Sequence, residues 1–319
     1  MKSLLRVGIS LAFIALLLYL MRDDIPQIGQ TLRNANRKIL LGMVAVFFST
    51  VVILARRLQL IFQAEEVRIG LGETCQLTFV GYFFNNFLPT AVGGDIVKAV
   101  CASRVTGEPV KSVTSVLMDR IFGLFTFILL PSISLLFIVK HLSNPAIPAI
   151  VYSFLGMSIL CFFLIFNRNV ARQFRFVETT LAWFRLHLKV RKIYDGLHDF
   201  KRHKGVAAQA MILSIIGQGI GILVLYGLAV ALGAKTSPIY FYLLVPVVHL
   251  VSMLPSLNGL GIRESAYIYF LSPYIGKEGS AALGILWLAL LFLLSLIGGL
   301  IYLVRQDYHI SIGKTASPE

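Results

Sequence analysis

Long apolar stretches separated by short polar segments make up most of the chain. Each long stretch is close to the about 17–25 apolar residues that a transmembrane helix needs. The pattern therefore predicts an all-α integral membrane protein. We expect six full transmembrane helices, at residues 4–21, 39–55, 113–139, 146–166, 206–232 and 280–304.

Two further apolar elements, 74–103 and 239–275, are interrupted by polar residues, proline and glycine. The interruption at 85–95 is named the first break, and the one at 254–264 the second break. Each half of these elements holds about 12–17 apolar residues, which is short for a membrane crossing. We expect two broken or re-entrant helical hairpins that return on the side they entered. Two ordinary short spans in place of each hairpin would give the same net topology.

The elements divide into two membrane repeats, residues 1–139 and 140–319, each ordered span, span, hairpin, span. Because three spans per repeat is an odd number, the second repeat enters the membrane from the opposite side. The first hairpin then dips from the cytoplasm and the second from outside, as in inverted-repeat transporters. Beyond the two breaks the repeats share no clear residue pattern, so this symmetry is predicted from topology alone.

Composition supports a membrane protein. The chain is 57% hydrophobic and 14% charged, with a mean hydropathy of +0.81, against about 45–50% apolar and about 25% charged residues in soluble domains. The net charge of +14 does not indicate a nucleic-acid partner, because most positive charge lies in loops between apolar spans.

Lysine and arginine predict the orientation. With a cytoplasmic N-terminus, 19 of them fall on the cytoplasmic side, 7 outside and 3 within membrane elements. Positive charge favours the cytoplasmic side. We therefore expect a multi-pass protein of the cytoplasmic (inner) membrane with both termini cytoplasmic. No small-x-small cleavage site follows 4–21, so we expect this stretch to be a retained span rather than a signal peptide.

The segment 167–205 contains ten Lys and Arg residues against three acidic ones, a net charge of +7. Its apolar residues recur at steps of three and four, which is typical of an amphipathic helix. It predicts an interfacial helix lying on anionic lipid. A cytoplasmic connector whose charge only sets the topology is the alternative. The apolar residues are Phe174, Val177, Leu181, Phe184 and Leu188.

The first break contains the first candidate substrate-binding residues. A helix beginning at its glycines would direct N–H groups into the membrane, where they bind anions such as phosphate. Asp95 and Lys98 would share a face of that helix, although Asp95 can instead cap the helix. The asparagines would bind a headgroup or satisfy the broken backbone. The candidates are Asn85, Asn86, Gly93, Gly94, Asp95 and Lys98.

Charged residues also stand near the start of the span at 113–139 and in the second break. The first pair either anchors at the interface or pairs inside the bundle. In the second break an arginine is suited to bidentate phosphate binding, and the adjacent glutamate would neutralise it; a structural pair that locks the hairpins together is the alternative. These candidates are Asp119, Arg120, Asn258, Gly259, Gly261, Arg263 and Glu264.

The remaining polar residues do not form a catalytic motif. The sequence has no HExxH, GxSxG, P-loop or CxxC pattern, so we expect a transporter rather than an enzyme. The three cysteines lack metal-ligand spacing, and we expect neither a metal nor a cofactor. His249 is interpreted as a packing residue, and the spacing of Gly217 and Gly221 as close helix packing.

Three blocks in this order resemble the lysylphosphatidylglycerol synthase transmembrane-region family, which contains flippase-like membrane proteins. The blocks read NNFLPTAVGGDIVKAVCASRVTGEP, SVLMDRIFGL and MLPSLNGLGIRESAY. The resemblance covers essentially the whole chain, and Asp119 stands where an acidic residue, often glutamate, is expected. The matching residues are Asn86, Pro89, Gly93, Gly94, Asp95, Lys98, Asp119, Arg120, Pro255, Gly259, Gly261, Arg263 and Glu264.

The resemblance implies a lipid flippase that moves an anionic phospholipid or a polyprenyl-phosphate-linked lipid. In two-domain members a separate soluble domain makes the aminoacylated lipid, and the few residues after 280–304 predict no such activity here. A membrane enzyme or accessory subunit for glycosyl or aminoacyl transfer, and a structural partner-binding protein, are the alternatives. The expected partners are a lipid with a phosphate headgroup, an anionic lipid surface at 167–205, and a second copy of the chain or a lipid-modifying enzyme.

Overall fold

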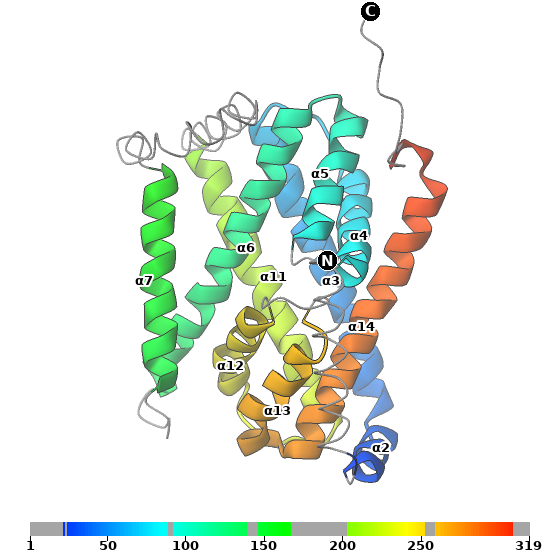
Figure 1. The fold of residues 1–319 in the computed structure, drawn as a ribbon, viewed down its shortest axis with the longest axis vertical. Helices are drawn as coiled ribbons and strands as arrows, with labels where there is room; N and C mark the ends of the chain where they lie inside the picture. Colours follow the sequence, from blue (N-terminus) through cyan, green and yellow to red (C-terminus); the bar gives the residue numbers. More distant parts are fainter. Residues whose placement is uncertain are drawn as a thin grey trace, which may run out of the picture.

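The computed structural model describes residues 22, 24–88, 92–138, 146–166, 203–252 and 259–308. Within these ranges all regular structure is helical, which confirms the predicted all-α class (Figure 1). The helices are α2 (Ile25–Arg33), α3 (Arg37–Ala64), α4 (Leu71–Phe87), α5 (Gly93–Thr106), α6 (Pro109–Ile138), α7 (Ala146–Phe166), α11 (Lys204–Ala231), α12 (Pro238–Val251), α13 (Ile262–Ile275), α14 (Lys277–Val304) and the 3₁₀ helix η3 (Gln306–Tyr308).

Four helices of the described part are long and apolar enough to cross a membrane: α3, α6, α11 and α14. Their 28 to 30 residues correspond to about 42–45 Å at 1.5 Å per residue, which exceeds the about 30 Å hydrocarbon core of a bilayer. The bounds of α7 match the predicted span 146–166. The predicted span 4–21 lies outside the described residues, as does all of 167–205 except its last three positions, so the count of six spans remains a prediction.

One predicted boundary is wrong. The span expected at 39–55 ends before Arg56 and Arg57, which we therefore counted on the cytoplasmic side, but α3 continues to Ala64. The apolar residues that follow the two arginines continue the helix, and Arg57 is buried. A buried arginine needs a counter-charge, and it has one, as described below.

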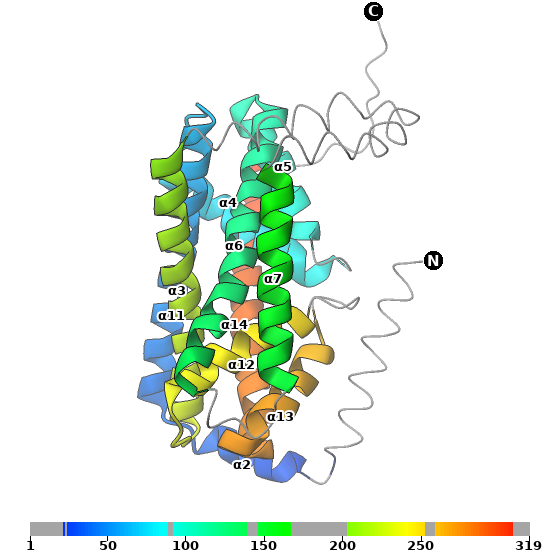
Figure 2. The same cartoon turned by 90° about the vertical axis from the view of Figure 1, so that its left-hand side faces the viewer.

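Each predicted hairpin is a pair of helices. The element 74–103 is α4 and α5, and the element 239–275 is α12 and α13. In Figure 1 the pair α4 and α5 occupies the upper half of the ribbon, and α12 and α13 occupy the lower half. Figure 2 gives the same separation after a 90° turn. The long helices run past both pairs, and the starts of α5 and α13 lie near mid-height (Figure 1).

Local sequence sets several helix ends. The Asn36 side chain accepts hydrogen bonds from the N–H groups of Lys38 and Ile39 at the start of α3, which is the preferred role of asparagine at that position. Ser237 caps α12 in the same way. Gly107 ends α5 with a φ of 72°, a left-handed conformation that favours glycine.

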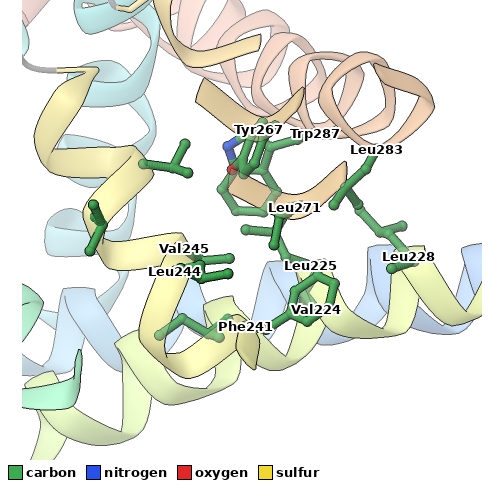
Figure 3. Packing of buried hydrophobic residues seen from close by; sticks show 14 of the residues in the cluster. Val224, Leu225, Leu228, Phe241, Leu244, Val245, Tyr267, Leu271, Leu283 and Trp287 are labelled. Carbon is green, nitrogen blue, oxygen red and sulfur yellow. The ribbon is translucent and has the colours of Figure 1, made fainter. Parts of the chain in front are cut away.

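The largest apolar core lies at the lower end of the ribbon. Figure 3 shows Phe241, Leu225, Tyr267 and Trp287 converging from α12, α11, α13 and α14. These side chains are buried, and their packing fixes the second hairpin against α11 and α14. This gives the second break a rigid base on which to position its charges.

The glycines of α11 have different roles. A Cβ at Gly217 would lie 3.1 Å from Leu54 Cδ2, so this residue allows α3 and α11 to pack closely, as predicted. A Cβ at Gly221 would meet nothing within 4 Å. The packing role predicted for Gly221 is therefore wrong: it lies against a cavity.

Candidate functional site

A cavity of about 300 Å³ lies between the two hairpins. It is bounded by α4 and α5 of the first hairpin, α12 and α13 of the second, and all four long helices. Most transporter sites lie where such broken elements face each other. The charged side chains that line the cavity are Arg57, Asp95, Lys98, Asp119, Arg120 and Arg263.

Five of these side chains form a continuous chain of alternating charge, named here the ion-pair chain. Arg57 Nε donates to Asp119 Oδ1 at 2.7 Å. Lys98 Nζ lies 3.6 Å from Asp119 Oδ2 and 3.6 Å from Asp95 Oδ1. Arg120 Nη1 lies 3.3 Å from Asp95 Oδ2. The chain therefore runs from α3 through α6 and α5 and back to α6.

The two ends of the ion-pair chain differ in exposure. Arg57 is 6% exposed and also donates from Nη1 to Ser214 Oγ at 2.9 Å, so its guanidinium is held on two sides. The Arg120 side chain is 30% exposed. Asp95 Oδ2 is buried and accepts no hydrogen bond from any residue that the structure describes. The end of the chain at Arg120 is therefore the more exposed one.

The ion-pair chain lies well inside the length of the long helices that could span a membrane. Asp119 follows Pro109, the first residue of α6, by ten residues, or about 15 Å. Arg57 precedes the last residue of α3 by seven residues, or about 10 Å. A hydrocarbon core of about 30 Å centred on these helices would begin about 6–7 Å from each end. Of the two interpretations of Asp119 and Arg120, this geometry favours pairing inside the bundle.

Asp95 does not cap its own helix. The start of α5 has no side-chain cap among the described residues, and the carboxylate pairs with Lys98 and Arg120. The N–H of Gly94 is bound by Asn85 Oδ1 at 2.9 Å. One of the N–H groups that we expected to bind an anion is thus satisfied by a side chain from α4.

Gly94 of the first break serves helix packing. A Cβ at Gly94 would lie 2.1 Å from the carbonyl oxygen of Gly81 on α4, a distance that no side chain tolerates. The absence of a side chain at this position lets α4 and α5 touch, which brings Asn85 and Lys98 to the same cavity wall. The close neighbour at Gly94 is therefore the backbone of α4.

The second break places a second ion pair at the cavity. Arg263 Nη2 lies 3.0 Å from Glu264 Oε1, and both side chains are buried. Glu264 also accepts a hydrogen bond from the N–H of Gly261 at 2.7 Å. Gly259 and Gly261 have φ values of 77° and 80°, which favour glycine. The pair lies within one hairpin, so its direct contact does not join the two hairpins.

His249 lines the cavity, although its sequence context indicated packing. Its ring stacks on Trp287 with centroids 5.9 Å apart. Its Nε2 lies 3.2 Å from the Tyr267 hydroxyl. Nδ1 is buried with no hydrogen-bond partner among the described residues. The histidine therefore both packs and borders the site.

The predicted residues separate into three groups. Those that line the cavity are Asn85, Asp95, Lys98, Asp119, Arg120, Gly259 and Arg263. Those that support it from behind are Asn86, Gly94, Gly261 and Glu264, and Gly93 is buried without lining it. Asn86 donates to the Leu291 carbonyl and to Ser295 of α14. Asn258 lies outside the described residues.

Sequence reasoning missed Arg57, Tyr82, Gln218 and Trp287 as cavity residues. The available signal for Arg57 was its position between apolar runs, which is costly in a membrane unless the residue has a function or a partner. Among the described residues, no group of three or more His, Cys, Asp or Glu side chains is placed to hold a metal ion.

The fold and the site define a polytopic α-helical membrane protein with a charged cavity between two helical hairpins. The chain belongs to the family described as the lysylphosphatidylglycerol synthase TM region, whose profile matches residues 3–299. This confirms the resemblance noted in the sequence.

One curated relative is a UPF0104 membrane protein of Methanothermobacter thermautotrophicus. It is 24% identical over 278 residues, which cover 80% of this chain and 81% of the relative. No solved structure matches the chain.

Proposed function

We propose that this protein is a lipid translocase that moves an anionic phospholipid, or a polyprenyl-phosphate-linked lipid, across the cytoplasmic membrane. The observation that carries the proposal is the convergence of four cations from separate helices in one cavity between the long apolar helices. Cations inside a membrane are costly and usually functional, and phosphate is the anion that membrane lipids carry. The four residues are Arg57, Lys98, Arg120 and Arg263.

An apolar cavity beside the charged one supports an amphipathic ligand. It has a volume of about 180 Å³ and lies between α6, α7 and α12. On α6, Phe127 borders the charged cavity and its neighbour Ile128 borders the apolar one. On α12, His249 borders the charged cavity and Leu250 borders the apolar one. A lipid likewise has a charged headgroup next to an apolar hydrocarbon chain.

Helix pairing supports the inverted repeat. α3 and α11 have 28 residues each, and α5 and α13 have 14 each. α14 packs on α4 as α6 packs on α12, and α5 packs on α6 as α13 packs on α14. Each of these contacts has a counterpart when the first repeat is exchanged for the second. We infer two hairpins that enter from opposite sides and meet at the site, as in transporters with inverted repeats.

The carboxylates are the partners that a phosphate would replace. Asp119 and Asp95 pair with Arg57, Lys98 and Arg120, and an entering phosphate takes the place of part of that pairing. The hydrocarbon chains stay in the bilayer, which avoids a cost of about 0.8 kcal/mol per CH₂ transferred to water. Rocking of one hairpin against the other then opens the site to alternate sides.

The test is translocation of headgroup-labelled lipid in liposomes that contain the purified protein. We expect faster transfer than in empty liposomes, and a rate at least about tenfold lower for Arg263→Gln. Arg33→Gln is the matched control, because Arg33 is exposed at the end of α2 and does not line the cavity.

Both variants must match the wild-type protein in gel-filtration elution and in thermal unfolding, so that a lost rate does not reflect misfolding. If wild-type protein transfers neither phospholipid nor polyprenyl-phosphate probes, with or without an ion gradient, the translocase proposal fails. An accessory role in lipid or glycolipid modification would then be the next hypothesis.

A further inference from the structure

We propose that the charged cavity selects headgroups with a single net negative charge, that is, phosphodiesters whose alcohol group carries no charge. Headgroups that are zwitterionic or doubly charged would be disfavoured. This inference rests on the proposed translocase function and names the chemical class of its substrate.

The inference begins with a charge count at the cavity. Four cations and two carboxylates line it, and Glu264 adds a third carboxylate bonded to Arg263. The described groups therefore carry a net charge of +1. Residues 89–91 and 253–258, which complete the two breaks, contain no acidic or basic residue. His249 is counted as neutral because it packs among the aromatic rings of Phe127 and Trp287.

The enclosure of the site makes this net charge matter. The side chains of Arg57, Asp119 and Lys98 are only 6–10% exposed, so little water screens them. An uncompensated charge in such surroundings is costly. A singly charged phosphate brings the total to zero. A doubly charged phosphate leaves −1, and a zwitterion leaves +1.

The position of the phosphate follows from how exposed the cations are. The Arg57 side chain is 6% exposed and is held by Asp119 and Ser214, whereas the Arg120 side chain is 30% exposed. Lys98 and Arg120 both face Asp95, whose Oδ2 accepts no hydrogen bond from the described part of the chain. We infer that the phosphate enters beside Asp95 and contacts Lys98 and Arg120.

The experiment compares three probe lipids with identical acyl chains in the liposome assay at about pH 8.5. Phosphatidylglycerol carries one negative charge, phosphatidylcholine is zwitterionic, and phosphatidic acid, a phosphomonoester, approaches two negative charges well above a second pKa near 6. We expect the wild-type protein to prefer phosphatidylglycerol by about tenfold or more over each of the others. Lowering the pH to about 5.5 protonates the phosphomonoester, which should reduce the difference in transfer rate between phosphatidic acid and phosphatidylglycerol.

Charge variants test the count itself. Arg120→Gln lowers the net charge to zero, which should remove the preference for phosphatidylglycerol over phosphatidylcholine. Asp95→Asn raises it to +2, which should shift the preference towards phosphatidic acid. The double variant has the wild-type net charge and should recover the wild-type order. Asp307→Asn is the matched control, because its side chain is 73% exposed and does not line the cavity.

The outcomes separate this inference from the translocase proposal. If the wild-type protein moves all three lipids at similar rates, charge selection is wrong and the translocase proposal stands. If the single variants move lipid with an unchanged order of preference, the charge count is also overturned. If the wild-type protein moves no lipid, the translocase proposal fails first. Because the wild-type comparison needs no variant, a misfolded variant does not leave the inference untested.

Discussion

Replacing Asp119 by asparagine tests whether the ion-pair chain holds the bundle together. The substitution keeps the shape of the side chain but removes a charge that faces Arg57 at 2.7 Å and Lys98 at 3.6 Å. Arg57 is then left buried without a carboxylate, although it keeps the hydrogen bond to Ser214. Breaking a buried ion pair in this way costs about 3–5 kcal/mol.

The structure places the expected loss near the lower limit of that range. Asparagine can still accept a hydrogen bond from Arg57, and Lys98 still has Asp95 at 3.6 Å. We therefore expect Asp119→Asn to lower the free energy of unfolding by about 3 kcal/mol. The measurement is a denaturant titration of the purified protein in mixed micelles, extrapolated to zero denaturant.

A double-mutant cycle separates the pair from the individual residues. Arg57→Met in the Asp119→Asn background removes the stranded cation, so the double variant should be more stable than the sum of the single losses by about 0.5–3 kcal/mol. Asp307→Asn, an exposed carboxylate beside Arg305, should change stability by less than about 1 kcal/mol. A loss below about 1 kcal/mol for Asp119→Asn, or strict additivity in the cycle, would refute the reasoning.

Two further predictions concern helix packing and the end of the last helix. Gly94→Ala should lower the free energy of unfolding by about 1–3 kcal/mol or more, because its Cβ would meet the Gly81 carbonyl oxygen. Gly42→Ala, whose Cβ would meet nothing within 4 Å, should raise that free energy by up to about 1 kcal/mol in the same denaturant titration. Equal effects of the two substitutions would contradict this packing argument. Burial, together with the hydrogen bond to Glu73, raises the pKa of Tyr308 above its ordinary value of 10.0, so the contribution of Tyr308 to stability is present below that pH and is lost above it. Tyr308→Phe should reduce the fall in melting temperature above that pH, and an unchanged profile would show that the tyrosine plays no part in it.

The helices could be predicted from the sequence because the signals that define them are local. Long apolar runs gave the long helices, and proline, glycine and polar residues marked the two breaks. The end of α3 was missed because the rule that charges belong in loops was applied to Arg57. That rule fails where a buried charge has a distant partner, and the partner of Arg57 lies 62 residues away in the sequence.

The pairing within the site could not be predicted, since it depends on how each helix is rotated. Asn85 and Asn86 are adjacent, yet about 100° apart around α4 at 3.6 residues per turn. Asn85 binds the Gly94 N–H at the cavity, and Asn86 binds α14. Both were predicted as site residues on the same evidence, and only the packing of α5 and α14 on α4 distinguishes them.

Both breaks are followed by a helix with a carboxylate in its first turn, but the two carboxylates have different partners. Asp95 and Glu264 each stand at the third position of a helix that begins at a break, where a carboxylate favours the positive end of the helix dipole. Glu264 binds the N–H of Gly261 and its neighbour Arg263, so its charge is satisfied within its own hairpin. Asp95 has no such cap and reaches Arg120 on another helix. If the proposed translocase function holds, an entering phosphate would displace Asp95 without unfolding a helix start, and we expect the first hairpin to be the half of the site that responds to the lipid.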